Sequence, residues 1–155
     1  MNEIITVKLS RDIKDKIRKS IDQLECGITS ECLDNFKDNI NIKYIKSGSN
    51  ILAFCIYSDI NKNRVLEDLE ATCDHFDNET YEYYEQLIQD MKEDTIYIHY
   101  LESIEKGYGY GKELVDSVIN LGKEVILYST LEAEEFWLNN DFDNIFGYEY
   151  MYYTE

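Results

Sequence analysis

The chain has 155 residues, with 32 acidic and 15 basic side chains and a formal net charge of −17 at pH 7. A charge of this sign opposes binding to nucleic acid or to an anionic membrane, and it favours a cationic amine substrate or a basic protein as the partner. The length is that of one domain with its own core, so we predict a single domain over residues 1–155.

Cysteine spacing and the amino-terminal residues indicate the compartment. The chain contains four cysteines, at Cys26, Cys32, Cys55 and Cys73. None of them forms a CxxC pair, and the amino terminus lacks the apolar run of a signal peptide or a membrane helix. We therefore expect a cytoplasmic protein with reduced thiols. Cys73, His75 and Asp77 lie close together but lack the paired spacing of zinc ligands, so no metal site is predicted.

The first predicted elements are a strand and a helix. Apolar and polar residues alternate over 5–9, as they do in a half-buried strand. Apolar residues then recur at helical spacing over 13–24, with Ser10 placed as the N-cap and Gly27 as the stop. A shorter helix is predicted over 30–37.

A hairpin and a long acidic segment follow. The pattern predicts strands over 41–46 and 51–58, joined by the polar turn 47–50. The segment 59–94 is polar and acidic, and its one clear signal is an amphipathic helix over about 79–91. This segment is therefore predicted to be a helical insertion between two strands.

The last third of the chain alternates strands and helices. The predicted elements are a strand at 95–102, a glycine-rich turn at 104–111, a helix at 112–121, a strand at 124–129, a helix at 131–139 and a strand at 145–153. Gly122 follows the first of these helices where a C′ glycine belongs. The complete order of elements predicts a mixed α/β fold.

The glycine-rich turn is the most informative stretch. Gly107, Gly109 and Gly111 lack the Cβ atoms that block a close backbone approach, and the helix that follows points unpaired N–H groups and its positive dipole end at the turn. These are the properties of a phosphate cradle, and the same turn also serves as a plain connection between a strand and a helix. A dinucleotide fingerprint is excluded because the turn lies far down the chain, and a Walker loop because Lys112 is followed by Glu113.

Residues around this turn resemble the signature of the Gcn5-related N-acetyltransferases. The signature is an aliphatic residue, then Gln or Arg, then glycine and a second small residue at fixed spacings. Its positions are occupied here by Leu101, Lys106, Gly109 and Gly111. The later helix is also similar to the family's, through Ala133, Phe136, Trp137 and Phe142. The resemblance implies a central mixed, mostly antiparallel twisted sheet of about six to seven strands flanked by helices, with a helical insertion before the signature strand.

The resemblance also implies that acetyl-CoA is the cosubstrate and that backbone amides hold its pyrophosphate. The cofactor-binding residues that it implies are Leu101, Lys106, Gly107, Tyr108, Gly109, Tyr110, Gly111, Lys112 and Trp137. The backbone amide of Leu101 would act as an oxyanion donor to the thioester carbonyl. Lys106 replaces Gln or Arg and still pairs with phosphate as a point charge. Trp137 stands where the family often has a tyrosine that protonates the departing thiolate, and an indole is not a useful acid.

Proton transfer requires an acid and a base. The candidate catalytic residues are His99, Glu102 and Tyr128. Histidine titrates near neutrality, so His99 is the predicted general base, with a packed or hydrogen-bonded strand histidine as the alternative. Glu102 and Asp94 are the next candidates, because desolvation makes a carboxylate a stronger base. Tyr128 is a candidate general acid, because its phenol could replace the tyrosine that is missing at position 137.

Two functional hypotheses follow. The first is an N-acetyltransferase that moves an acetyl group from acetyl-CoA to a primary amine by direct attack, the amine belonging to a small polyamine-like molecule, an aminoglycoside or a lysine side chain. The alternative is a catalytically weakened binding protein that keeps this scaffold and engages a basic protein partner through its acidic surface. Trp137 and the heavy negative charge motivate the alternative. Many members of the family dimerise, so a homodimer is also expected from the resemblance.

Overall fold

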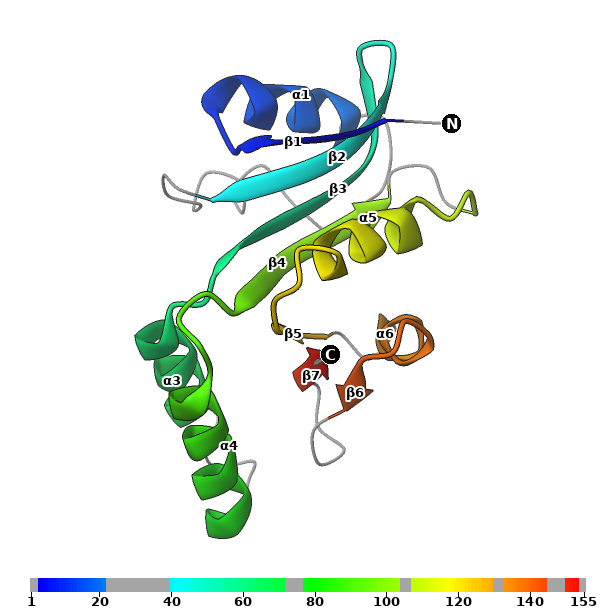
Figure 1. The fold of residues 1–155 in the computed structure, drawn as a ribbon. Helices are drawn as coiled ribbons and strands as arrows, with labels where there is room; N and C mark the ends of the chain where they lie inside the picture. Colours follow the sequence, from blue (N-terminus) through cyan, green and yellow to red (C-terminus); the bar gives the residue numbers. More distant parts are fainter. Residues whose placement is uncertain are drawn as a thin grey trace. The chain divides into compact units, whose positions relative to one another are not determined.

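The computed structural model describes residues 3–21, 40–71, 77–103, 107–129, 133–144 and 150–153 (Figure 1). Contacts within the chain divide it into two compact units. The first comprises Met1–Ser58 and Ile98–Gly122, and the second comprises Asp59–Tyr97 and Lys123–Glu155. The prediction of a single domain concerns how the two units behave together, and it stays a prediction. Among the described helices, none is both long and apolar enough to cross a membrane.

The first unit contains a sheet that begins as an antiparallel hairpin with an added strand. Its neighbouring strands are, in order, β1 (Ile4–Lys8), β2 (Asn41–Ser47), β3 (Asn50–Asp59) and β4 (Ile96–Ser103). The end of β3 at Asp59 and the start of β4 at Ile96 and Tyr97 belong to the second unit. β1 pairs with β2, and β2 with β3, in antiparallel orientation. Gly48 in the turn between β2 and β3 has φ +61°, which glycine adopts without strain. The predicted hairpin is therefore confirmed.

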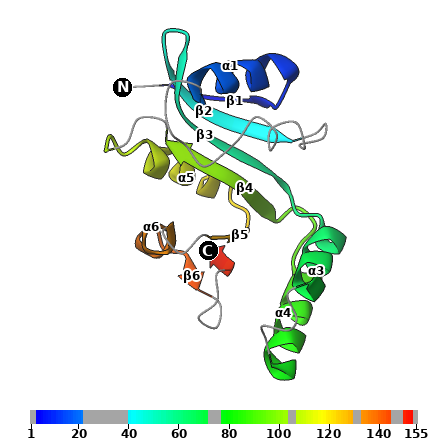
Figure 2. The ribbon, with the colours of Figure 1, turned by 180° about the vertical axis from the view of Figure 1, so that it is seen from behind.

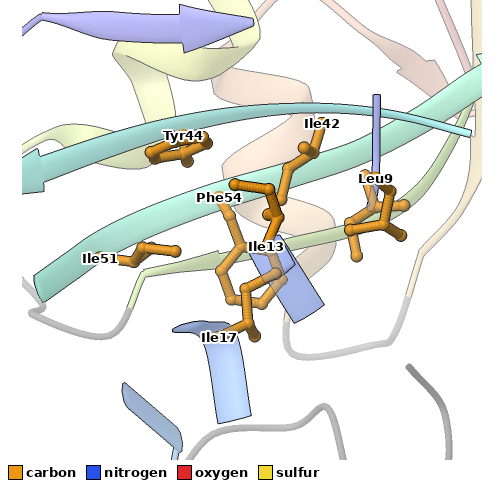
Figure 3. Packing of buried hydrophobic residues seen from close by; sticks show 8 residues of the cluster. Leu9, Ile13, Ile17, Ile42, Tyr44, Ile51 and Phe54 are labelled. Carbon is orange, nitrogen blue, oxygen red and sulfur yellow. The ribbon is translucent and has the colours of Figure 1, made fainter. Parts of the chain in front are cut away.

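Helix α1 (Arg11–Ile21) packs on this sheet through a buried apolar cluster (Figure 3). Ser10 is its N-cap as predicted, because the Ile13 amide donates a hydrogen bond to Ser10 Oγ at 3.3 Å. The side chains of Ile13 and Ile17 lie against Phe54 of β3. The buried members of the cluster are Leu9, Ile13, Ile17, Ile42, Tyr44, Ile51, Phe54 and Ile56. Burial of each large apolar side chain contributes about 1.5–3 kcal/mol, so this cluster is a main source of the stability of the first unit.

Helix α5 (Tyr110–Ile119) runs alongside β4 and also contacts β2 (Figure 1, Figure 2). Leu114, Val115 and Val118 form its inner face and are fully buried, as the helical spacing predicts. The helix is closed by Gly122, which has φ +76° and donates its N–H to the Ile119 carbonyl at 3.0 Å. The buried face and the Gly122 cap together fix the position of α5, including its first turn, which directly follows the glycine-rich segment.

The second unit contains a helical hairpin. Helices α3 (Lys62–Ala71) and α4 (Asn78–Asp90) lie side by side (Figure 1, Figure 2). Leu69 of α3 and Tyr84 and Ile88 of α4 are buried in one apolar cluster. The N-cap of α4 is Asp77, whose Oδ1 accepts the Thr80 amide at 2.7 Å, and this hydrogen bond lowers the pKa of the Asp77 carboxyl. The predicted helical insertion before the signature strand is thus confirmed, and α3 is an addition to it.

The remaining elements of the second unit form a small antiparallel sheet with one short helix. They are β5 (Val125–Tyr128), α6 (Glu134–Asn139), β6 (Asp143–Asn144) and β7 (Tyr150–Tyr153). β7 lies between β5 and β6 and pairs antiparallel with both. At the start of β4, the Ile96 amide donates to the Glu124 carbonyl at 2.8 Å, just before β5 begins.

The fold class predicted from the sequence is confirmed: a mixed α/β fold, with seven strands in the part of the chain that the structure describes. Two details differ. Val7 is 37% exposed although it was expected on the buried side of the first strand, and β6 was not predicted. The predicted helix at 30–37 and the predicted stop at Gly27 lie outside the described residues.

Candidate functional site

The glycine-rich turn leads from β4 into α5 through two glycines in the left-handed region. Gly107 has φ +90° and Gly109 has φ +76°. A Cβ atom placed on either glycine would have no other heavy atom within 4 Å, so these glycines are required by the backbone and not by crowding. Lys106, the basic residue of the signature, lies outside the described residues.

The first turn of α5 presents bare amides. Gly109 is the N-cap and has no side chain to cap the helix, and the first intrahelical hydrogen bond runs from the Glu113 amide to the Gly109 carbonyl at 3.2 Å. The amides of Tyr110, Gly111 and Lys112 precede that bond, so helix geometry gives them no carbonyl within the helix. With the positive end of the helix dipole, they form a place suited to an anion such as phosphate.

Lys112 adds a cation to this turn. Its Nζ lies 3.0 Å from Asp116 Oδ2, one helical turn further on, and both side chains are more than half exposed. An exposed pair of this kind contributes at most about 1 kcal/mol. The free energy lost on breaking this ion pair is therefore small, and the Lys112 ammonium can pair with a phosphate instead.

β4 places His99 next to a serine of the neighbouring strand. His99 Nε2 lies 2.8 Å from Ser58 Oγ at the end of β3, and both groups are partly buried. Either the serine hydroxyl donates to the ring, or the protonated ring nitrogen donates to the hydroxyl and leaves Nδ1 as the basic nitrogen. In both cases the imidazole is oriented by a specific partner. Leu101 and Glu102 follow on the same strand and are half-buried.

The first unit thus brings together His99, Leu101, Glu102 and residues 107–112 on one strand, turn and helix. Ser58 was not predicted as part of the site. Its only sequence signal is its position at the end of an apolar strand, and the contact with His99 depends on how β3 and β4 pair, which residue patterns do not specify.

Two predicted site residues belong to the second unit. Tyr128 ends β5, where its backbone pairs with Tyr150 of β7. Trp137 lies in α6, is 5% exposed, and makes edge-to-face contacts with Phe136 and Phe142, each with ring centroids 5.1 Å apart. These contacts account for the burial of the indole by packing alone. The proposed roles of Tyr128 and Trp137 in chemistry and cofactor binding stay predictions.

A row of polar side chains crosses the first three strands. Thr6, Lys43 and Cys55 are cross-strand partners. Lys43 is only 6% exposed and donates to Thr6 Oγ1 at 2.9 Å, and burial lowers its pKa. Burial raises the pKa of the Cys55 thiol to about 12, against a smaller opposite effect of Lys43. A buried, protonated thiol is a poor nucleophile, so Cys55 is a packing residue and not a catalytic one.

We expect Cys55 to make the fold sensitive to alkali. An unfolded thiol ionises near pH 9, whereas the buried one stays protonated up to about pH 12. The stability that it contributes is therefore complete below pH 9 and falls by about 1.4 kcal/mol per pH unit above it. The raised pKa of Tyr57 acts in the same sense, and the lowered pKa of Lys43 acts in the opposite one.

Urea unfolding of the wild type and of Cys55→Ala isolates the thiol from the other titrating groups. Between about pH 8 and about pH 10.5, the wild type is expected to lose about 2 kcal/mol more free energy of unfolding than the variant. Equal losses in the two proteins would show that Cys55 does not carry the effect.

Metal ligands do not gather in the described residues, where no group of three or more His, Cys, Asp or Glu side chains is placed to hold an ion. Of the three neighbouring residues Cys73, His75 and Asp77, the first two lie outside the described residues.

In the first unit, β4 leads into a glycine-rich turn and then into α5, whose first turn is uncapped. Solved structures of acetyltransferases share the fold of the chain. The chain is similar to the Bacillus subtilis N-acetyltransferase YlbP in complex with coenzyme A, at 15% identity and a TM-score of 0.62, over 100% of this chain and 97% of that one. It is also similar to Arabidopsis thaliana NAA60 in complex with acetyl-CoA, at 14% identity and a TM-score of 0.58, over 97% and 98% of the two chains.

A third similar structure is the aminoglycoside N-acetyltransferase AAC(6')-Iy in complex with CoA, at 12% identity and a TM-score of 0.54, over 94% of this chain and 91% of that one. No protein-family model matches the chain, and no curated protein matches it either. At these identities the likeness establishes the fold: the chain has the fold of the Gcn5-related N-acetyltransferase superfamily.

Proposed function

We propose that the protein is an acetyl-CoA-dependent N-acetyltransferase that acts on a primary amine. The observation that carries the proposal is the start of α5, where Gly109 in the left-handed region caps the helix without a side chain, so the amides of Tyr110, Gly111 and Lys112 have no carbonyl partner within the helix. Solved proteins of the same fold hold CoA or acetyl-CoA. A pyrophosphate is the ligand that such a turn fits best.

Different residues of the first unit bind different parts of the cofactor. The amides from Tyr108 to Lys112 receive the pyrophosphate, with the Lys112 ammonium as an additional cation. The backbone N–H of Leu101 donates to the thioester oxygen and stabilises the charge that develops on it during attack. A CoA thioester bound in this way supplies the activated acetyl group.

His99 is proposed as the general base. An amine at neutral pH carries a proton that must leave before the nitrogen can attack, and a histidine accepts protons in this pH range. The arrangement that suits a base has Nε2–H donating to Ser58 Oγ and Nδ1 as acceptor, so Ser58 is a positioning residue. Glu102 is the second candidate for the base, and Tyr128 is the candidate acid that returns a proton to the thiolate.

The charge of the chain points to the class of acceptor. With 32 acidic and 15 basic side chains, the protein attracts cations and repels nucleic acid and anionic lipid. A small polyamine-like molecule, an aminoglycoside or a lysine side chain all present a primary amine with positive charge. We propose acceptors of this class, and a homodimer as the assembled state.

A second candidate function rests on Trp137. The tyrosine acid that the family often uses is replaced here by an indole that is buried among Phe136 and Phe142. A protein that keeps the scaffold without an acid would bind and not catalyse. Its acidic surface would then engage a basic protein partner.

Calorimetric titration with acetyl-CoA, followed by a screen of amines for release of the CoA thiol, distinguishes these functions. Saturable binding with turnover of a polyamine, an aminoglycoside or a lysine peptide supports the enzyme. Saturable binding without turnover of any of them favours the binding protein. Absence of acetyl-CoA binding by the folded protein overturns the proposed cofactor site.

A further inference from the structure

Tyr108 is the most exposed large aromatic residue among those described, with 67% of its surface open to solvent. It lies between Gly107 and Gly109, whose positive φ angles set the course of the backbone on both sides of it. An exposed aromatic ring does not gain the stabilisation that burial provides. Exposed apolar surface of this kind can mark a site that binds a ligand.

The ring of Tyr108 stacks on that of Tyr110. The centroids are 5.5 Å apart and the planes differ by 18°, the offset-parallel arrangement that aromatic rings favour. Tyr110 is half-buried at the start of α5 and supports one face of the Tyr108 ring. The exposure of Tyr108 means that the rest of its ring stays open to solvent. This pair is therefore a ready platform on which a further planar ring can stack.

We infer that the Tyr108 ring stacks against the adenine of the cofactor. The inference rests on the proposed function, because it takes the pyrophosphate to lie on the amides of 108–112. In CoA only a ribose separates the pyrophosphate from the purine, so the purine is within reach of a ring that borders that cradle. Acetyl-4′-phosphopantetheine has the thioester, the pantetheine and one phosphate but no purine.

Stacking of a base on an exposed aromatic ring depends on the ring face and not on the phenol hydroxyl. Tyr108→Phe keeps the face and is expected to bind acetyl-CoA within about twofold of the wild type. Tyr108→Ala removes it and is expected to weaken acetyl-CoA binding by about tenfold. Tyr83→Ala removes another exposed tyrosine, on α4, that is 47% exposed, and serves as the matched control.

The experiment is calorimetric titration of these four proteins with three probes: acetyl-CoA, adenosine 3′,5′-bisphosphate and acetyl-4′-phosphopantetheine. The inference expects Tyr108→Ala to weaken the first two probes about tenfold and to leave the third unchanged. Equal binding of acetyl-CoA by the wild type and Tyr108→Ala would overturn it, and so would equal loss of all three probes.

Failure of the proposed function gives a different pattern. If the wild type binds adenosine 3′,5′-bisphosphate in a Tyr108-dependent manner but binds neither thioester, the purine platform stands and the acetyltransferase proposal falls. If the wild type binds none of the three probes, both fall. If acetyl-CoA binds and Tyr108→Ala has no effect, only the assignment of Tyr108 falls.

Discussion

Replacing Gly109 with aspartate is expected to weaken acetyl-CoA binding by about 100-fold or more. A carboxylate at position 109 adds bulk where the phosphate is proposed to lie, competes with it for the amides of the first turn of α5, and repels the pyrophosphate by its charge. Loss of two charge-assisted hydrogen bonds at about 1.5 kcal/mol each gives a factor of this size. Calorimetric titration measures the change directly.

Two matched variants separate charge from shape and from strain. Gly109→Asn has nearly the same shape without the charge, and asparagine tolerates the left-handed region. It is expected to bind more tightly than the aspartate variant and more weakly than the wild type. Gly48→Asp introduces the same residue at φ +61° in the β2–β3 turn and is expected to bind normally. Equal binding by the two Gly109 variants would contradict the electrostatic explanation.

Replacing His99 with glutamine is expected to lower kcat by about 100-fold or more while leaving acetyl-CoA binding within about twofold. Glutamine keeps a group that hydrogen-bonds to Ser58, so the strand pairing is preserved and only the proton acceptor is lost. Steady-state kinetics with the amine found by the screen give kcat, and titration gives the affinity. The variant should also lose the increase in rate with pH that a histidine base produces near neutrality.

Three further variants show whether the role belongs to His99. Ser58→Ala is expected to lower kcat by less than His99→Gln does, since it only releases the ring from its partner. Glu102→Gln and Tyr128→Phe test the second base and the acid. A large loss in Glu102→Gln together with a small one in His99→Gln would transfer the role of the base to Glu102, and His99 would then be a structural histidine.

Local signals in the sequence predicted much of the fold. Ser10 caps α1, Gly122 closes α5, and Gly48 turns the β2–β3 hairpin, as their residue types and positions predict. Each of these features depends on one or two residues and their immediate neighbours. The positive φ angles at Gly107 and Gly109 are local features of the same kind, because glycine adopts such angles without strain.

Features that depend on distant contacts were missed. α3 is only 10 residues long and lies in a polar segment, so its stability comes from Leu69 packing with Tyr84 of α4 and not from its own propensity. β6 consists of Asp143 and Asn144, which carry no apolar signal and form a strand only because β7 is beside them. Ser58 meets His99 through the pairing of two strands that are far apart in the sequence.

The cradle at the start of α5 is made of main-chain N–H groups and of glycines that need only a left-handed φ. Its working parts are therefore nearly independent of side-chain identity, apart from Gly107 and Gly109. Under mutation, the neighbouring side chains can change while the main-chain geometry of the proposed phosphate cradle persists. The chain has 15% identity to a coenzyme A-bound acetyltransferase and shares its fold, and a turn of this kind can keep its main-chain geometry at such low identity.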